Sequence, residues 1–320
     1  MKCYRYLGRY YGFRTLLDGR FKLSAPCEFN DPFDCAGAIV GTISNRYFEK
    51  FVKPTIDKDG FLEDLQEEEN YGLCERGTMR QRIEQFKEFY KRALVLRYLN
   101  KRSDFNKVVR ILCLSNAGDG SDRRRSDDAL LWSHYAEAGR GLRIGLNVDD
   151  ADLPLPVVVR YTNQMPSLDL NELKVCIDSE PYDGHPQVEF LDRCLRTKSK
   201  PWSYEREVRL AFPAMDKRIE SLSGKCFVRL KPKLFWRVDF GHKTFRNDAE
   251  FLSVVEKLRT RGYGHVEFRL AALDQRRYGY RYRTVDEVDK AEKKRLEKET
   301  RRARWEQIRM KSPYGIQGTD

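Results

Sequence analysis

Hydrophobic and polar residues alternate in several short stretches of the chain, and this pattern predicts β-strands with one buried face. Such strands are predicted over residues 2–8, 108–115, 141–148, 154–161, 203–212, 225–232, 235–241, 265–273 and 278–285. Apolar residues three and four positions apart, together with helix start and stop signals, predict helices over residues 127–139, 187–196, 248–263 and 285–311. This succession of elements favours an α+β fold with a mixed, mostly antiparallel sheet.

The chain opens with a strand, a short helix that ends at Gly19, and a second strand. Residues 45–107 differ in pattern from the predicted strands around them, because they are rich in charged residues and carry apolar side chains at helical spacing. These apolar residues are Met79, Ile83, Phe86, Tyr90, Leu94 and Tyr98. We therefore expect one α+β domain over residues 1–284 with a helical insertion at 45–107. A charged helical tail over 285–320 follows, with an acidic start and a basic end.

The composition leans basic, with a formal net charge of +12 and a pI near 9.2. This charge favours polyanionic partners such as nucleic acid, or a phosphate-bearing cofactor. The eight cysteines form no C-x-x-C pair and have no zinc-site spacing with the four histidines, so we expect reduced thiols. No stretch is long and apolar enough for a membrane span, and we expect a cytoplasmic protein without membrane contact.

Residues 197–212, TKSKPWSYEREVRLAF, combine a predicted strand with two acidic residues close together. From Ser203 onward, Tyr204 belongs to the core face of this strand, and Glu205, Glu207 and Arg209 share the other. Carboxylates two residues apart on one face lie about 7 Å apart and repel each other unless a cation, a proton or a ligand intervenes. Two interpretations remain open. Either Arg209 neutralises the pair on a solvated face, or one glutamate acts on a hydroxyl or water while the other orients it or holds a metal.

Two further stretches carry candidate site residues. Arg5 lies on the first strand, where its side chain could bind a phosphate or form an ion pair with an acidic residue such as Asp34. The segment PCEFNDPFDC predicts a turn at Asn30 and Asp31. Asp31 and Asp34 either cap backbone donors of this turn or reach a site shared with Glu205.

Aromatic and basic residues elsewhere suggest binding surfaces. Trp132, His134 and Tyr135 lie on a predicted short helix that could form the wall of a pocket, with Trp132 or Tyr135 stacking on a flat ring and His134 more typical of a structural residue. The polar loop before this helix carries three arginines at 123–125, which suit either phosphate binding or an exposed connection. Arginines and tyrosines alternate over 276–283, a pattern typical of a nucleic-acid surface or of an amphipathic edge strand.

Three stretches together resemble the bacterial and phage-borne domain-of-unknown-function 2971 family, namely LSAPCEFNDPFDC, LLWSHYAEAGRGLRIGL and TKSKPWSYEREVRL. Members of that family carry an FNDPFD-type turn, a W-S-H-Y-A segment and a W-x-Y-E-x-E-x-R strand in this order. The third motif matches Trp202, Tyr204, Glu205, Glu207 and Arg209. The resemblance implies a fold and a candidate site rather than a known activity.

The order of elements is also similar to that of ADP-ribosyltransferases, in which a first-strand arginine or histidine holds NAD. This likeness implies that Arg5 binds the dinucleotide, that Ser133 or Tyr135 fills the role of a middle-strand serine or tyrosine, and that Glu207 engages the nicotinamide ribose with Glu205 as companion. The chain departs from those enzymes because it has no serine-rich middle strand.

We therefore expect an NAD-dependent enzyme of the ADP-ribosyltransferase type, a toxin or phage-defence effector that acts on nucleic acid or protein. One alternative is a metal-dependent nuclease in which Asp31, Asp34, Glu205 and Glu207 gather Mg²⁺. Another is a nucleic-acid or protein binding module without catalysis. A protein partner would bind through residues 45–107 or through the C-terminal helix.

Overall fold

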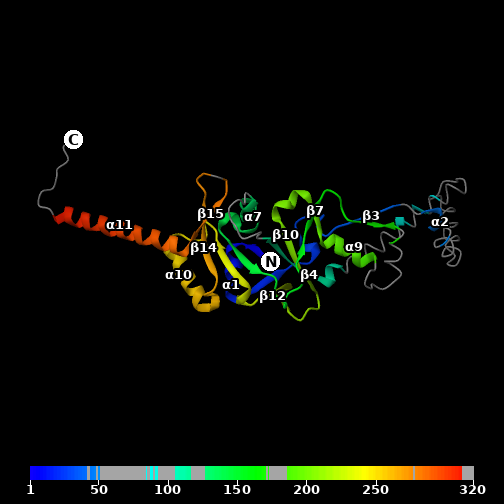
Figure 1. Ribbon diagram of the computed structural model, residues 1–320, viewed down its shortest axis with the longest axis horizontal. Helices are drawn as coiled ribbons and strands as arrows, with labels where there is room; N and C mark the ends of the chain where they lie inside the picture. The colour runs from blue at the N-terminus through cyan, green and yellow to red at the C-terminus, as the bar shows by residue number, and fades with distance from the viewer. Residues whose placement is uncertain are drawn as a thin grey trace.

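A computed structural model of the chain describes residues 1–41, 44–47, 50, 84, 87–88, 91–92, 105–116, 127–170, 172, 186–276 and 278–311. An eight-stranded sheet with the order β15-β14-β13-β5-β1-β4-β10-β6 forms its centre (Figure 1). Only β13 and β14 pair in parallel within this sheet, and the other neighbours are antiparallel. The predicted α+β fold with a mixed, mostly antiparallel sheet and a C-terminal helix is confirmed.

The strands of the large sheet follow one another along the chain as β1 (Lys2–Leu7), β4 (Val109–Asn116), β5 (Leu142–Asn147), β6 (Val157–Val158), β10 (Glu207–Pro213), β13 (Phe235–Phe240), β14 (Glu267–Leu273) and β15 (Tyr280–Thr284). A three-stranded sheet contains β2 (Arg20–Leu23), β11 (Ile219–Leu222) and β12 (Lys225–Arg229). Two strand pairs complete the β-structure of the described residues, β3 (Ala38–Val40) with β8 (Ser167–Asp169), and β7 (Arg160–Thr162) with β9 (Thr197–Ser199).

The described α-helices are α1 (Arg9–Asp18), α2 (Asn45–Tyr47), α6 (Phe105–Val108), α7 (Asp127–Tyr135), α9 (Pro186–Leu195), α10 (Asp248–Leu258) and α11 (Val285–Lys311). Short 3₁₀ turns are η1 (Pro26–Glu28), η4 (Glu137–Gly139), η5 (Lys200–Glu205) and η6 (Pro232–Leu234), and η7 (Arg259–Tyr263) is a π-helical turn. As predicted, α1 ends at Gly19, which adopts a left-handed φ of 71° that glycine reaches without strain.

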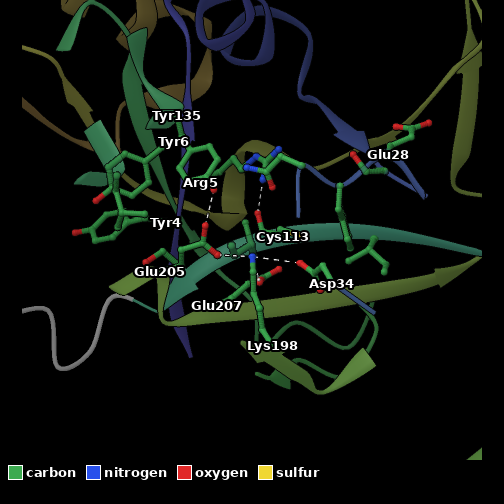
Figure 2. A pocket seen from close by; sticks show the side chains of 17 residues that line it. Tyr4, Arg5, Tyr6, Glu28, Asp34, Cys113, Tyr135, Lys198, Glu205 and Glu207 are labelled. Carbon is green, nitrogen blue, oxygen red and sulfur yellow. Dashed lines mark hydrogen bonds and ion pairs between the residues drawn. The ribbon is translucent and has the colours of Figure 1, made fainter. Parts of the chain in front are cut away.

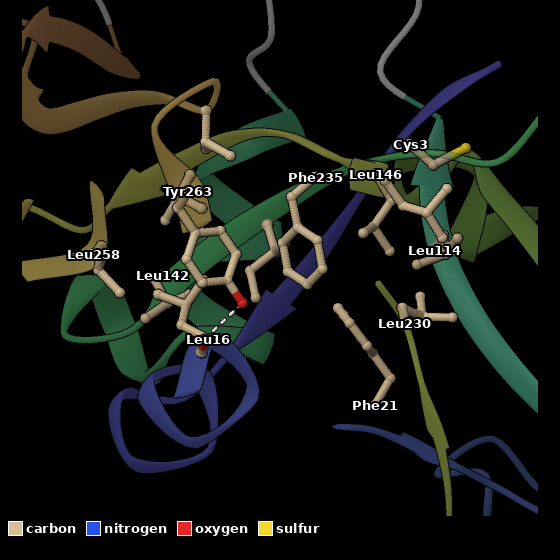
Figure 3. Packing of buried hydrophobic residues seen from close by; sticks show 14 of the residues in the cluster. Cys3, Leu16, Phe21, Leu114, Leu142, Leu146, Leu230, Phe235, Leu258 and Tyr263 are labelled. Carbon is tan, nitrogen blue, oxygen red and sulfur yellow. Dashed lines mark hydrogen bonds between the residues drawn. The ribbon is translucent and has the colours of Figure 1, made fainter. Parts of the chain in front are cut away.

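The main hydrophobic core lies on the face of the sheet that α1 and α10 cover. Phe21 of β2 packs against Phe235 of β13, and the ring of Tyr263 of η7 packs edge to face against Phe235 (Figure 3). The buried hydroxyl of Tyr263 donates to the carbonyl oxygen of Leu16 at 2.6 Å. This bond ties η7, which directly follows α10, to α1, and so both helices are held against one face of the sheet.

Helix α7 covers the opposite face. Tyr6 of β1 packs edge to face against Trp132 of α7, with ring centroids 5.5 Å apart. Beneath them the fully buried Arg143 of β5 pairs with Asp128 of α7 at 2.8 Å and with Asp239 of β13 at 2.6 Å. An aromatic contact and a buried ion pair therefore fix α7 to the sheet.

Residues 280–283 of the basic and tyrosine-rich segment belong to β15, which lies at one edge of the sheet. Tyr282 is half-buried, and its ring lies 4.4 Å from the guanidinium of Arg143. The predicted edge strand is confirmed, and the nucleic-acid surface stays a prediction.

Most of the predicted helical insertion at 45–107, including the apolar stripe from Met79 to Tyr98, lies outside the described residues, as do the three arginines at 123–125. No helix of the described part of the chain is long and apolar enough to cross a membrane.

Candidate functional site

A cavity of about 290 Å³ opens where the neighbouring strands β1 and β4 separate. β1 pairs with β5 along its whole length but with β4 only near its start. Beyond this point Ser24, which follows β2, pairs with Ile111 and replaces β1 as the neighbour of β4. Arg5 and Tyr6 of β1 therefore line the cavity together with Ile111 and Cys113 of β4.

Glu205 and Glu207 come from different elements, so the predicted strand over residues 203–212 is wrong at its start. Glu205 ends η5, and Glu207 begins β10. Pro201 lies in the first turn of η5, where its fixed φ suits a helical turn. Arg206, between the glutamates, adopts a left-handed φ of 47°. This reversal of the chain brings both carboxylates to the cavity.

Lys198 of β9 joins the acidic side chains. Its ammonium nitrogen lies 2.6 Å from Glu205 and 3.2 Å from Glu207 and Asp34 (Figure 2). Burial alone would lower the pKa of Lys198, but the three carboxylates outweigh burial and raise it, so the ammonium stays charged. On the other side, the hydroxyl of Tyr135 donates a short hydrogen bond to Oε1 of Glu205. The sequence analysis did not identify Lys198 as a site residue.

Arg209 of β10 is fully buried and pairs with two of the carboxylates. Its guanidinium donates to the two oxygens of Glu207 at 2.9 and 3.0 Å, and to Asp34 at 2.6 Å. Burial alone would raise the pKa of Glu207, but Arg209 and Lys198 outweigh burial and lower the pKa to about 2. The predicted pairing with Arg209 is confirmed for Glu207, although the face is buried rather than solvated.

The low pKa of Glu207 predicts a loss of stability in acid. Its folded-state pKa of about 2 lies below the ordinary value of 4.5, so the stabilisation is complete above pH 4.5 and is lost as the pH falls through 2. A difference of that size corresponds to about 3 kcal/mol. We expect the gap in unfolding free energy between the parent and Glu207→Gln, measured by urea titration, to shrink by about this amount between pH 6 and pH 2. A gap that stays constant would contradict the assignment.

The two glutamates differ in how many acceptor sites are occupied, and a carboxylate offers about four. Glu207 accepts three hydrogen bonds from Arg209 and Lys198, and the Cys113 thiol adds to the causes that lower its pKa. Within the described part of the chain, Glu205 accepts hydrogen bonds from Tyr135 and Lys198 alone. Glu205 therefore keeps more acceptor capacity for a ligand than Glu207 does.

Arg5 bridges the gap between the separated strands. Its Nη1 donates to the carbonyl oxygen of Cys113 at 2.6 Å. It has no ion pair among the residues that the structure describes, so the predicted alternative of a pair with Asp34 is wrong. The reason is that Lys198 and Arg209 already neutralise Asp34. The remaining N–H groups of Arg5 leave a guanidinium fork for a ligand in the cavity.

Among the residues proposed on α7, only Tyr135 lines the cavity. Trp132 is fully buried, so the prediction that it stacks on a cofactor is wrong. Ser133 and His134 are exposed and do not line the cavity. Helical spacing explains this result, because Leu131 and Tyr135 are four residues apart and share the face that meets the cavity.

The two aspartates of the predicted turn at 26–35 have different roles. Asn30 and Asp34 line the cavity. Oδ1 of Asp31 instead accepts a hydrogen bond from the backbone N–H of Phe33 at 2.9 Å. Capping is therefore the role of Asp31, and the shared site is the role of Asp34.

Trp202 and Tyr204 of η5 form an aromatic row with His134 beside the cavity. Ring centroids are 6.0 Å apart between Trp202 and Tyr204, and 6.1 Å apart between Tyr204 and His134. Tyr204 is half-buried and packs against the cluster that contains Tyr4 and Trp132, although η5 replaces the predicted start of the strand. The Lys198 ammonium lies 5.0 Å from the Trp202 ring and so links the row to the acidic side chains.

A magnesium site of the predicted kind needs Asp31, Asp34, Glu205 and Glu207 around one ion. Asp31 does not line the cavity, and the other three carboxylates surround the Lys198 ammonium. In the described residues, no group of three or more His, Cys, Asp or Glu side chains is arranged to hold a metal ion. The site is therefore an ion-paired acidic cluster beside a cavity.

Comparison of the chain with protein-family models, curated proteins and solved structures gives no match. The resemblance to the domain-of-unknown-function 2971 family and the likeness to ADP-ribosyltransferases therefore stay predictions.

Proposed function

We propose that the protein is an NAD-consuming transferase of the ADP-ribosyl type, with its active site in the cavity between β1 and β4. One observation carries the proposal. Arg5, which keeps N–H groups for a ligand, and Glu205, which keeps acceptor sites, line the same cavity. A guanidinium fork suits a pyrophosphate, and a carboxylate suits a ribose hydroxyl and a developing positive charge.

In this reaction the bond between C1′ of the nicotinamide ribose and the ring nitrogen breaks, and nicotinamide leaves with the bonding electrons. A lone pair on the acceptor forms the new bond to C1′, and the acceptor proton passes to water. Positive charge develops on the ribose in between. Glu205 is the carboxylate that would stabilise this charge. Glu207, which accepts three hydrogen bonds from Lys198 and Arg209, holds these two side chains in position.

The cavity suits one half of a dinucleotide. Its volume of about 290 Å³ lies at the lower limit of typical ligand pockets, so the ribose and one flat ring would occupy it and the remainder would lie at its mouth. Tyr4, Tyr6, Phe29 and Tyr135 contribute aromatic walls. The acceptor in our proposal is a nucleic acid or a protein, as expected for a toxin or defence effector.

We also infer a cytoplasmic location. Six cysteines of the described residues carry thiols and form no disulfide. Reduced thiols are typical of that compartment.

The first test is the shift in melting temperature caused by NAD. Because NAD would bind only the folded protein, a concentration 100-fold above its Kd stabilises the fold by about 2.7 kcal/mol, or on the order of 5 °C. We expect Arg5→Gln to abolish this shift. The control is Arg229→Gln, which makes the same change at an exposed arginine paired with Glu220 on the three-stranded sheet. A folded parent that NAD does not stabilise would sink the proposal and favour a binding module.

A further inference from the structure

Helix α11 (Val285–Lys311) extends away from the body of the protein (Figure 1). Val288 is fully buried in the main core, and Glu292 is the last buried residue among the side chains of α11 that the structure describes, up to residue 308. From residue 293 to residue 308 every side chain is exposed. The outer part of α11 is therefore a solvated helix whose surface is open to a partner.

The exposed part of α11 carries one basic stripe. At 100° per residue, Lys290, Lys294, Lys298, Arg301 and Trp305 fall within an arc of about 80°. All five are exposed, Trp305 by 72%. With a rise of 1.5 Å per residue, the stripe is about 22 Å long.

Ion pairs on α11 lie to either side of this basic stripe. Lys293 pairs with Asp289, Arg295 with Glu292 and Glu299, and Arg302 with Glu306. In the described residues, none of the four cations of the basic stripe forms an ion pair. The acidic partners occupy the far side of the helix. Two acidic residues reduce the charge of this surface: Glu297 lies at the edge of the stripe, and Glu287 lies in line with it one turn before Lys290, so the net charge is about +2.

We propose that the basic stripe of α11 binds the phosphodiester backbone of a nucleic acid. Four cations without acidic partners supply phosphate contacts, and an exposed aromatic ring among them supplies a surface on which a base can stack. A membrane surface fits less well. Helices that lie on membranes bury an apolar face opposite the basic one, whereas the far side of α11 carries Asp289, Glu292, Glu299 and Glu306. The proposal does not depend on the chemistry of the cavity.

The test is the salt dependence of binding to a fluorescent 20-nucleotide single strand and to a 20-base-pair duplex of mixed sequence, using the full chain. The stripe variant combines Lys294→Gln, Lys298→Gln and Arg301→Gln. The control variant combines Lys293→Gln, Arg295→Gln and Arg302→Gln, which removes the same charge from ion-paired positions. Far-UV circular dichroism checks that both variants keep their helix content.

Four phosphate contacts give a slope of log K against log salt of about −3.6 for duplex DNA. The stripe variant keeps one of the four contacts, so its slope is expected to be about −0.9. From 50 to 200 mM salt, the contribution of α11 to affinity then falls about 150-fold in the parent and about 4-fold in the stripe variant. A loss confined to the stripe variant with either probe supports the proposal, and the probe that binds identifies the form of nucleic acid. Equal losses of affinity in both variants, or no binding of either nucleic acid at 50 mM salt, would overturn it. Vesicles that contain phosphatidylserine serve as a third probe, and binding to these vesicles alone would also overturn it.

Discussion

Replacing Glu205 by glutamine is expected to slow the release of nicotinamide from NAD by about 10²–10³-fold, while the protein stays folded. The magnitude is that of removing one preorganised electrostatic group from an active site. The fold is expected to survive because glutamine can still accept from Lys198, which keeps Glu207 and Asp34 as partners. NAD binding, measured by thermal shift, should fall much less than turnover, since the charge on the ribose develops only in the transition state.

The matched control is Glu292→Gln on α11. It makes the same chemical change at a buried glutamate that pairs with Arg295. Glu292 does not line the cavity. This variant should release nicotinamide at the parent rate. Turnover that persists in folded Glu205→Gln would remove this carboxylate from the mechanism. A larger loss of turnover in Glu207→Gln than in Glu205→Gln, compared at a temperature where both variants are folded, would return the catalytic role to Glu207, which the likeness to ADP-ribosyltransferases favours.

The sheet could be predicted from the sequence because its strands carry the alternation that a half-buried strand requires. β10 shows where this reasoning fails. Tyr204 and Glu205 continue the alternation into η5, so the pattern cannot reveal that the strand begins only at Glu207. Pro201 was the available signal for a turn, but the left-handed backbone of Arg206 has no signal in the residue type. The two glutamates were nevertheless predicted to lie together, and they do.

Lys198 was missed for a different reason. It lies in a lysine-rich segment whose pattern does not separate a buried ammonium from an exposed one. Its partner Asp34 is 164 residues away in the chain, and only the tertiary fold brings β9 to the turn that carries Asp34. Trp132 shows the opposite error, because an aromatic residue on a short helix can belong to a pocket wall or to the core. The contact of Trp132 with Tyr6 shows that Trp132 belongs to the core.

Arg143 defines a second buried polar cluster, on the side of the sheet that α7 covers. It is completely buried, with Asp128 and Asp239 as ion partners and with its guanidinium 4.2 Å from the ring of Tyr4. Burial alone would lower the pKa of Arg143, but its acidic and tyrosine neighbours raise it, so its charge is permanent. Removing one partner of such a cluster leaves the opposite charges buried and uncompensated.

Arg143→Met is therefore expected to reduce the free energy of unfolding by about 3–5 kcal/mol, measured by urea denaturation at pH 7. Asp239 keeps Arg269 as a partner at 2.5 Å, whereas Asp128 loses its ion pair with Arg143. Adding Asp128→Asn should then recover at least about 1 kcal/mol, because the amide can still accept from the tyrosine hydroxyls around it. If the two substitutions instead destabilise additively, lost packing rather than buried charge explains the role of Arg143. Because α7 carries Tyr135, the single variant should also weaken NAD binding at the cavity, and the double variant should restore part of that binding.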